Sequence, residues 1–288
     1  MRAAIDIGSN TVRLLIGDVD NGRVNARYQQ LFTTRLGETE VGGRLSAEGR
    51  RKTVAALQKF AQALEEHGVE GPPVVAATSA VREAADGEDF AAEIKAELGW
   101  DLRILSGRQE AECSYAGAAS AGCGNAVVID VGGGSTEIIC RGEDGNICGK
   151  SVKVGAVRLY RGEVPADALR GVLLPLLQVL PKGGGRDFVS VGGTITMLAA
   201  MLLGITEYTR EAVSGYRISV KTLAALKAEL EPLSPAERLH KYPMLAGRED
   251  IIIAGLTIYL TLAELLAAEE FVASDAGLLD GLLLGAAD

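Results

Sequence analysis

The apolar and polar positions at the start of the chain follow a strand pattern. Residues 4–16 read AIDIGSNTVRLLI, in which two apolar runs flank a glycine-containing turn, and a second turn signal follows at 20–22. Short apolar runs bounded by such turn residues are typical of β-strands joined by hairpins. The opening therefore predicts strand, glycine-rich turn, strand, turn and strand.

The same pattern returns at a constant offset of 124 residues. Residues 128–140 read VIDVGGGSTEIIC, so that Asp6 aligns with Asp130 and Gly8 with Gly132, and turn residues again follow at 144–146. Repetition of a supersecondary unit indicates duplicated domains. We predict two related domains, with a boundary near residues 117–122.

Between and after the two copies, the apolar period lengthens to that of a helix. At 46–67, Val54, Leu57, Ala61 and Leu64 recur at helical spacing after Ser46, a favourable N-cap. Comparable patterns predict helices at 88–98, 167–180, 194–203, 221–230, 249–268 and 278–284, and strands at 73–78, 102–105, 188–191 and 271–273. This alternation favours α/β domains, and the cleft between them is the expected ligand site.

Charge and composition narrow the classes of function. The net charge is −9 and the sequence has no basic tail, which disfavours general nucleic-acid binding. The apolar stretches at 188–206 and 251–263 are better explained as core elements than as membrane spans, and the N-terminus lacks the apolar run of a signal peptide. The four cysteines form no C-x-x-C pair, which favours reduced thiols. We expect a soluble cytoplasmic protein without a membrane role.

Three glycine-rich loops are candidate phosphate sites. Glycines let backbone N–H groups approach an anion, neighbouring hydroxyls add donors, and the third loop also opens a predicted helix, whose N-terminus favours anions. Plain hairpin turns are the alternative, but two aligned copies that each follow an aspartate favour phosphate binding. The candidate residues are Gly8, Ser9, Asn10, Thr11, Gly132, Gly133, Gly134, Ser135, Gly192, Gly193 and Thr194.

Carboxylates beside these loops imply a cation. Asp6 and Asp130 end apolar strands next to the loops, where bare carboxylates would repel phosphate. Magnesium, or manganese in its place, suits a few carboxylates together with phosphate oxygens. Glu137 is placed to support the metal or an attacking water, whereas its counterpart in the first copy is Arg13.

Further motifs narrow the family. ATSAVRE at 77–83 follows a predicted strand, and LSGRQEAE at 105–112 precedes the second copy of the repeat. With RLG at 35–37, VGAVRL at 154–159 and a looser match at 274–281, they resemble the signature motifs of the Ppx/GppA family of exopolyphosphatases and guanosine pentaphosphate phosphohydrolases. The resemblance covers nearly the whole chain. It implies two actin-like, ribonuclease H-like domains at 1–118 and 119–274, with the last helix, 275–288, packing on the first.

The resemblance also assigns roles to two residues. Glu110 matches the catalytic carboxylate that orients or deprotonates water for attack on a terminal phosphoryl group. Arg82 matches an arginine that contacts phosphate. Taken alone, Glu110 would be interpreted as a solvated helix carboxylate and Arg82 as an ion-pair partner of Glu83 or Asp86. Several linked motifs in order favour the functional interpretation of both.

Some positions depart from the family pattern. Asp86 stands where asparagine is expected, and Leu279-Asp280 stands where many members have Arg-Glu. We expect a member of the short form, which resembles those without the additional C-terminal helical domain. A loop at 182–186 carries two cations and is interpreted as a plain connection, with contact to a polyanion as the alternative.

The expected substrate is inorganic polyphosphate, whose terminal phosphate would be released by metal-assisted attack of water. Guanosine pentaphosphate (pppGpp), a nucleotide of the stringent response, is the alternative, because both substrates present a terminal phosphoanhydride. A kinase of the same superfamily and a non-catalytic sensor of polyphosphate or nucleotide complete the alternatives. A homodimer is compatible with these expectations, although no segment identifies an interface.

Overall fold

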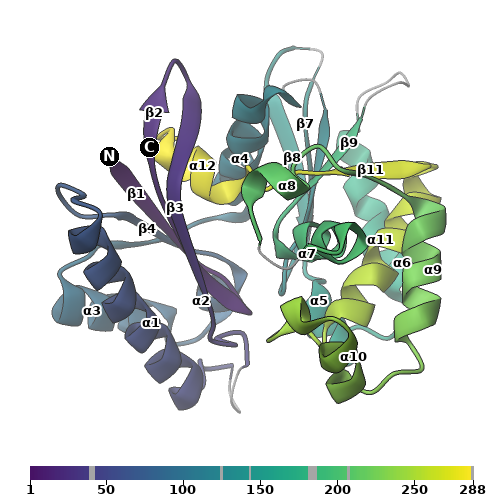
Figure 1. Cartoon of the computed structure of the whole chain (residues 1–288), viewed down its shortest axis with the longest axis horizontal. Coiled ribbons are helices and arrows are strands. Elements are labelled where there is room, and N and C mark those ends of the chain that lie inside the picture. The colour runs from purple at the N-terminus through teal and green to yellow at the C-terminus, as the bar shows by residue number, and fades with distance from the viewer. Residues whose placement is uncertain (39–42, 124–125, 143, 181–186, 206–207, 287–288) are drawn as a thin grey trace. The chain divides into compact units, whose positions relative to one another are not determined.

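The computed structural model describes residues 1–38, 43–123, 126–142, 144–180, 187–205 and 208–286 (Figure 1). The loop at 182–186 therefore lies outside the described residues. The chain divides into two compact units: one comprises Met1–Ala121 and Leu278–Asp288, and the other comprises Gly122–Gly277. Each unit contains one copy of the sequence repeat and one β-sheet.

The sheet of the first unit has the order β3-β2-β1-β4-β5. Its first three strands form the predicted antiparallel meander, and β4 and β5 continue the sheet in parallel with β1. Because the carboxyl ends of parallel strands meet at one edge, the segments that follow β1, β4 and β5 lie together. The strands are β1 (Arg2–Ile7), β2 (Thr11–Asp20), β3 (Arg23–Thr33), β4 (Val74–Ala77) and β5 (Leu102–Ile104).

Helices cover both faces of this sheet. α1 (Ala47–Glu66) and α3 (Gly87–Leu98) pack against one face in a cluster that includes Ile5, Phe60 and Phe90. On the other face, α4 (Gly107–Ala118) and α12 (Leu278–Leu283) pack in a cluster that includes Ala4 and Leu282. Burial of one such large apolar side chain contributes about 1.5–3 kcal/mol. The short α2 (Ser79–Glu83) follows β4 at the carboxyl edge.

Local sequence signals set the ends of the long helices. The Ser46 hydroxyl accepts a hydrogen bond from the Gly49 N–H at 3.0 Å, which confirms the predicted N-cap of α1. Ser106 and Gln109 form a capping box at the start of α4, with each side chain bonded to the backbone of the other. Such boxes satisfy amide groups that the first helical turn leaves without partners. The cap fixes the first turn of α4, which carries Glu110.

The sheet of the second unit has the order β10-β11-β9-β6-β7-β8. β6, β7 and β8 repeat the antiparallel meander, β9 and β11 run parallel to β6, and β10 pairs antiparallel with β11. The strands are β6 (Val127–Val131), β7 (Thr136–Arg141), β8 (Ile147–Val152), β9 (Phe188–Val191), β10 (Arg217–Ser219) and β11 (Glu270–Ala273).

One large apolar cluster joins the helices of the second unit to its sheet. The longest of these helices are α7 (Gly193–Leu203), α9 (Val220–Leu230) and α11 (Ile252–Leu266), all close to their predicted positions. The shorter elements of this unit are α5 (Ala156–Tyr160), α6 (Leu169–Leu173), η2 (Leu174–Val179), α8 (Arg210–Val213), α10 (Pro235–Lys241) and η3 (Pro243–Leu245). η1 (Ala119–Cys123) includes the point in the chain where the first unit gives way to the second.

The single helix predicted at 167–180 is wrong. The structure has the short α6, followed by the 3-10 helix η2 with Pro175 in its first turn. Proline has no backbone N–H and its ring clashes with the carbonyl four residues earlier, so an α-helix cannot continue through it without distortion. The apolar period of the segment was interpreted correctly, because Leu169, Leu173 and Leu176 all enter the core.

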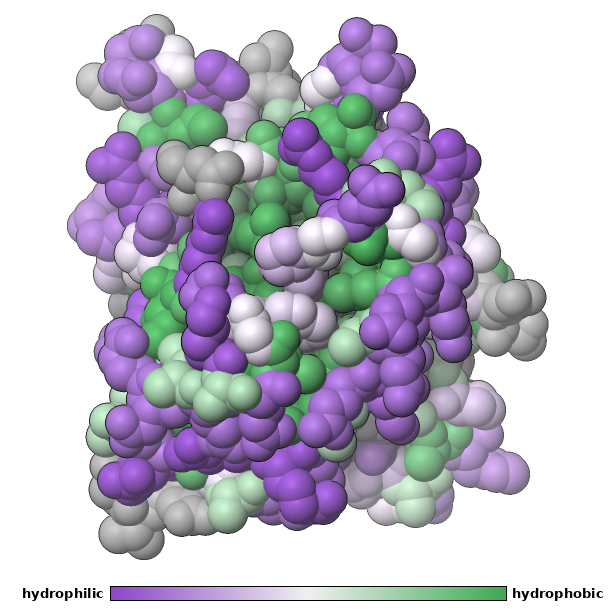
Figure 2. Space-filling model, turned by 90° about the vertical axis from the view of Figure 1, so that its left-hand side faces the viewer, coloured by the Kyte–Doolittle hydropathy of each residue, from purple (hydrophilic) through white to green (hydrophobic). Residues whose placement is uncertain are grey.

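Polar residues dominate the face of the protein shown in Figure 2, with hydrophobic residues visible between them. Within the described ranges, no helix is long and apolar enough to cross a membrane. The two apolar stretches that raised this question contain α7 and α11, whose buried residues belong to the core of the second unit.

Candidate functional site

The two repeated glycine loops have the same internal geometry. In the first unit the Gly8 N–H donates to the Thr11 carbonyl at 3.0 Å, and in the second the Gly132 N–H donates to the Ser135 carbonyl at 3.0 Å. An added Cβ would lie 3.1 Å from the carbonyl oxygen at Gly8 and 3.4 Å from it at Gly132. The sequence duplication therefore corresponds to a duplicated hairpin turn after an aspartate-bearing strand.

The first loop is braced by two other motifs of the first unit. The Ser9 hydroxyl lies 3.1 Å from the Ser79 hydroxyl at the start of α2. The Gly37 N–H donates to the Ser9 carbonyl at 2.7 Å, and a Cβ on Gly37 would lie 2.8 Å from the Ser9 Cβ. Asn10 and Thr11 are also buried. The RLG and ATSAVRE motifs therefore have a structural role in holding this loop.

The second loop is braced in a comparable way by the segment that begins α5. The Ala156 and Val157 N–H groups each donate at 2.9 Å, to the carbonyls of Gly132 and Gly133. A Cβ on Gly155 would lie only 2.5 Å from the Gly133 carbonyl oxygen. The VGAVRL motif thus requires glycine at 155 because the two backbones nearly touch.

The third loop lies between β9 and α7 and is packed against Asp130. Gly192 has φ of 87°, and a Cβ there would lie 2.6 Å from Asp130 Oδ1. The Thr194 hydroxyl donates to the Val131 carbonyl at 3.1 Å, so it ties α7 to β6. The Thr194 hydroxyl, which was predicted to donate to a phosphate, therefore donates to a backbone carbonyl in this structure.

Arg248, which the sequence reasoning missed, also lies at the third loop. A Cβ on Gly193 would fall on its guanidinium group, and the residue is 9% exposed. A buried arginine beside a helix N-terminus places two sources of positive potential together, which favours an anion. The only signal in the sequence was a basic residue just before the apolar stretch at 251–263.

The predicted carboxylates occupy two different environments. On β1, Asp6 Oδ2 accepts hydrogen bonds from Arg13 Nε at 3.1 Å and Nη2 at 2.6 Å, while its buried Oδ1 has no hydrogen-bond partner within the described residues. On β6, Asp130 faces Glu137 across the strand pair, and Glu137 Oε1 accepts from the Ser151 hydroxyl at 2.6 Å. The change from arginine to glutamate thus makes the second copy more acidic.

Glu110 lies on the first turn of α4 and is 8% exposed. Arg82 Nη1 donates to Glu110 Oε2 at 2.8 Å and to the Leu105 carbonyl at 2.8 Å. The structure therefore brings the two predicted residues together across 28 positions of sequence. Three residues further along α4, Gly281 of α12 meets the backbone of Cys113 so closely that a Cβ has no room.

The described part of the chain contains no cluster of three or more metal-binding side chains. Of the three predicted metal ligands, Asp6 belongs to the first unit, and Asp130 and Glu137 belong to the second. Their oxygen atoms suit a hard divalent cation, and the partnerless Oδ1 of Asp6 retains capacity to accept. The donor chemistry fits a magnesium or manganese ion.

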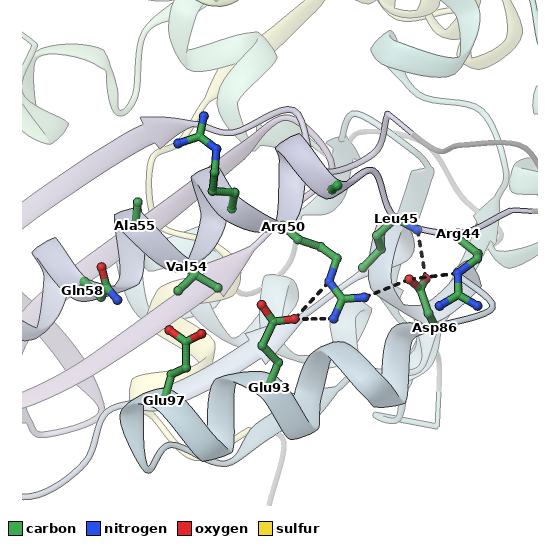
Figure 3. A pocket seen from close by; sticks show the side chains of 11 residues that line it. Arg44, Leu45, Arg50, Val54, Ala55, Gln58, Asp86, Glu93 and Glu97 are labelled. Atoms are coloured by element: carbon green, nitrogen blue, oxygen red, sulfur yellow. Dashed lines mark hydrogen bonds and ion pairs between the residues drawn. The ribbon is translucent and has the colours of Figure 1, made fainter.

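A groove of about 630 Å³ lies between α1 and α3, and none of the predicted site residues lines it (Figure 3). Asp86 accepts from the Leu45 N–H at 2.9 Å and pairs with Arg50 at 3.0 Å and Arg44 at 3.6 Å, and Arg50 also pairs with Glu93. Burial raises the pKa of Asp86, but the Leu45 hydrogen bond and the two guanidinium charges outweigh burial and lower it. Asp86 therefore fastens the segment before α1 to the start of α3.

The other departure, Leu279-Asp280, is also buried in the first unit. Leu279 is 7% exposed and belongs to the cluster under α4, while Asp280 is 2% exposed. The exchange of arginine for leucine thus replaces a charged side chain with an apolar one that packs.

Comparisons with known proteins agree with the resemblance. The model of the Ppx/GppA phosphatase family matches residues 15–288. Exopolyphosphatase 2 of Mycobacterium tuberculosis is 32% identical over 315 residues, covering 99% of this chain and 98% of that protein. The guanosine-5'-triphosphate,3'-diphosphate pyrophosphatase of Aliivibrio fischeri is 28% identical, and the match covers 100% of this chain but only 59% of that protein.

Among solved structures, the Aquifex aeolicus member of the Ppx/GppA family matches with a TM-score of 0.78 and 27% identity, covering 98% of this chain and 96% of that one. This similarity confirms the predicted fold class, two related actin-like α/β domains. The ligand site predicted in a cleft between the domains stays a prediction.

Proposed function

Because this chain belongs to the Ppx/GppA phosphatase family, we propose that it is an exopolyphosphatase, which hydrolyses the terminal phosphoanhydride of inorganic polyphosphate. The observation that carries the proposal is the buried carboxylate of Glu110, held by Arg82 at 2.8 Å at the carboxyl edge of the first sheet. Exopolyphosphatase 2 of Mycobacterium tuberculosis, a relative whose sequence is covered to 98% by the match, supports this proposal by its name.

Glu110 acts on water in this proposal. A carboxylate that orients or deprotonates the attacking water contributes about 10²–10⁴-fold to the rate. The ion pair with Arg82 keeps the carboxylate fixed, and the hydrogen bond from Arg82 to the Leu105 carbonyl fixes the arginine itself. Arg82 is thereby a positioning residue, and its remaining N–H groups are donors for a phosphate oxygen.

The glycine loops and Arg248 bind phosphate. The first loop is tied to α2, and therefore to Arg82, through the contact between Ser9 and Ser79. At the third loop, the backbone N–H groups and the Arg248 guanidinium supply the positive potential, because the Thr194 hydroxyl is bonded to Val131. Phosphoryl transfer depends mainly on such positioning and charge stabilisation.

Asp6 in the first unit and the Asp130 and Glu137 pair in the second are the candidate carboxylate ligands of a divalent cation, magnesium or manganese. When bound, this ion neutralises charge on the phosphate oxygens. The Ser151 hydroxyl donates to Glu137 Oε1 at 2.6 Å and so holds the carboxylate of Glu137 in one orientation. Chelation by EDTA should therefore abolish phosphate release, and added Mg²⁺ should restore it. Full activity in EDTA would contradict this part of the proposal.

The second candidate function is hydrolysis of pppGpp at its terminal phosphate. The similarity to the Aliivibrio fischeri enzyme along the whole of this chain favours it. Both substrates present the same bond to the same groups, so the choice between them rests on the initial rates of phosphate release from each at equal concentration.

The experiment that tests the proposal compares two glutamate-to-glutamine substitutions on the same helix, α4. We expect Glu110→Gln to lower phosphate release from polyphosphate by about 10²-fold or more, the scale of a general base. Glu112→Gln is the matched control, because Glu112 lies on the same helix and pairs with the exposed Arg108 at 2.8 Å. Equal rates for Glu110→Gln and wild type would refute the role of Glu110. No release by wild type from either substrate would refute both candidate functions.

A further inference from the structure

Two cysteines of the second unit lie directly opposite each other on neighbouring strands. Cys140 on β7 pairs in register with Cys148 on β8, and the register between these strands is continuous from Thr136 to Arg141. Neither cysteine takes part in a disulfide in the described structure; Cys140 is buried and Cys148 is exposed. β8 is the end strand of its sheet in the described structure, which accounts for the exposure of Cys148.

The two thiols lie on the same face of the sheet. Side chains of directly paired residues project to the same side, as the hydrogen bond between Ser151 and Glu137 shows elsewhere on these strands. The Cys148 Sγ leans across toward β7, because a Cβ on Gly142 would lie 3.4 Å from it. Gly142 is two residues beyond Cys140 and so shares its face.

The backbone spacing also suits a covalent bond. The hairpin closes with the Gly142 N–H donating to the Asn146 carbonyl at 2.8 Å. Hydrogen-bonded and non-hydrogen-bonded pairs alternate along an antiparallel ladder, so Cys140 and Cys148 form a hydrogen-bonded pair with Cα atoms about 5.5 Å apart. Disulfides span Cα separations of about 4.4–6.8 Å. Their Cβ atoms must approach slightly, which an end strand permits because β8 has a sheet partner on one side.

We propose that Cys140 and Cys148 form a reversible cross-strand disulfide when the protein meets a small-molecule disulfide such as oxidised glutathione. The exposed Cys148 thiolate attacks one glutathione sulfur, the glutathione S–S bond breaks, and one glutathione thiolate leaves and takes up a proton. Cys140, as thiolate, then attacks the Cys148 sulfur and displaces the second glutathione. The protein loses two protons and two electrons, and one oxidised glutathione takes them up to become two reduced molecules.

The bond would connect β7, which carries Glu137, to β8, which carries the hydrogen-bond donor of Glu137. Cys140 and Glu137 are both on β7, and Ser151, which donates to Glu137, is on β8 with Cys148. In the reduced protein the Cys140 thiol donates a hydrogen bond to the Val179 carbonyl at 2.9 Å. Disulfide formation removes this hydrogen bond and replaces it with the covalent link to Cys148. The bond therefore restrains the end strand that holds Glu137 in place.

The other two cysteines serve as internal controls. Cys113 is buried in the first unit, on α4. Cys123 is half-buried, and burial together with the charge of Asp187 raises the pKa of its thiol, which leaves less thiolate to react. Neither lies on a strand beside Cys140 or Cys148 within the described sheets.

The test incubates the folded full-length protein with oxidised glutathione, blocks residual thiols with iodoacetamide and maps the peptides by mass spectrometry. We expect one Cys140–Cys148 linkage, reversed by excess reduced glutathione. Cys148→Ser should abolish the linkage, whereas Cys140→Ser should accumulate glutathione on Cys148, because no second thiol displaces it.

Three results would overturn the proposal: a stable glutathione adduct on wild-type Cys148, a linkage that uses Cys113 or Cys123, or no reaction at all. The Cys113→Ser, Cys123→Ser double variant keeps the proposed pair alone and must still give the linkage. These readouts do not depend on the enzymatic activity, so a failed hydrolysis assay leaves the test intact.

Discussion

Gly155 gives the sharpest test of how the second glycine loop is held. Replacing it with alanine would put a methyl group 2.5 Å from the carbonyl carbon and oxygen of Gly133, and 2.6 Å from the carbonyl oxygen of Gly132. These are backbone atoms, so no flexible side chain can turn away. Ordinary contact begins at 3.4 Å, and either the loop or α5 must therefore move by about 0.9 Å.

The displacement predicts two effects of different size. Overpacking of this kind destabilises a protein by about 1–3 kcal/mol. A shift of about 1 Å in a group that positions substrate lowers the rate by up to about 10²-fold. We expect both, because the Ala156 and Val157 N–H groups are bonded to the loop carbonyls at 2.9 Å and transmit any movement of α5 to the loop.

The assays are urea unfolding and phosphate release from polyphosphate. Gly171→Ala is the matched control: it makes the same change in the same unit, at a helical position where the added methyl meets nothing within 4 Å. Alanine is favoured over glycine in a helix by up to about 1 kcal/mol, so this control should be neutral or stabilising. An unchanged unfolding midpoint and rate for Gly155→Ala would refute the reasoning. Lower stability with full activity would show that α5, and not the glycine loop, moves to make room for the methyl group.

Two further changes test the buried polar contacts. Asp86→Asn should destabilise the protein by about 1–2 kcal/mol at pH 7, because it removes the charge that faces Arg50 but keeps an acceptor for the Leu45 N–H. The folded-state pKa of Asp86 is lowered, so its contribution is present above the unfolded pKa of about 3.9 and is lost as the pH falls through the folded value. Urea unfolding of both proteins from pH 7 to pH 3 should show the difference shrinking, and a constant difference would contradict this account. Ser151→Ala removes the hydroxyl donated to Glu137 at 2.6 Å and should raise the Mg²⁺ concentration needed for half-maximal phosphate release several-fold, with unfolding within about 1 kcal/mol of wild type; an unchanged Mg²⁺ requirement would separate Ser151 from metal binding.

Much of the fold was readable because its signals are local. The repeated hairpins follow from apolar runs and turn residues within about 20 positions, and Ser46 caps α1 through an amide three residues away. Such signals act between residues that are close in sequence, so they can be recognised without knowing which distant segments pack against them. The aligned Asp6 and Asp130 likewise predicted two equivalent turns, which share the same internal hydrogen bond.

The tertiary structure alone decided which partner each candidate site residue contacts. Arg82 donates to Glu110, a residue 28 positions away whose approach depends on the parallel pairing of β4 and β5, and its contact with phosphate stays a prediction. Arg248 precedes α11, and it reaches the third loop because α11 packs against the sheet of the second unit, from which that loop extends. The sequence determined the loops, the strands and the chemistry of the side chains, since these depend on local backbone preference. Contacts between distant segments depend on how strands pair and helices pack, and a sequence pattern does not encode those distances.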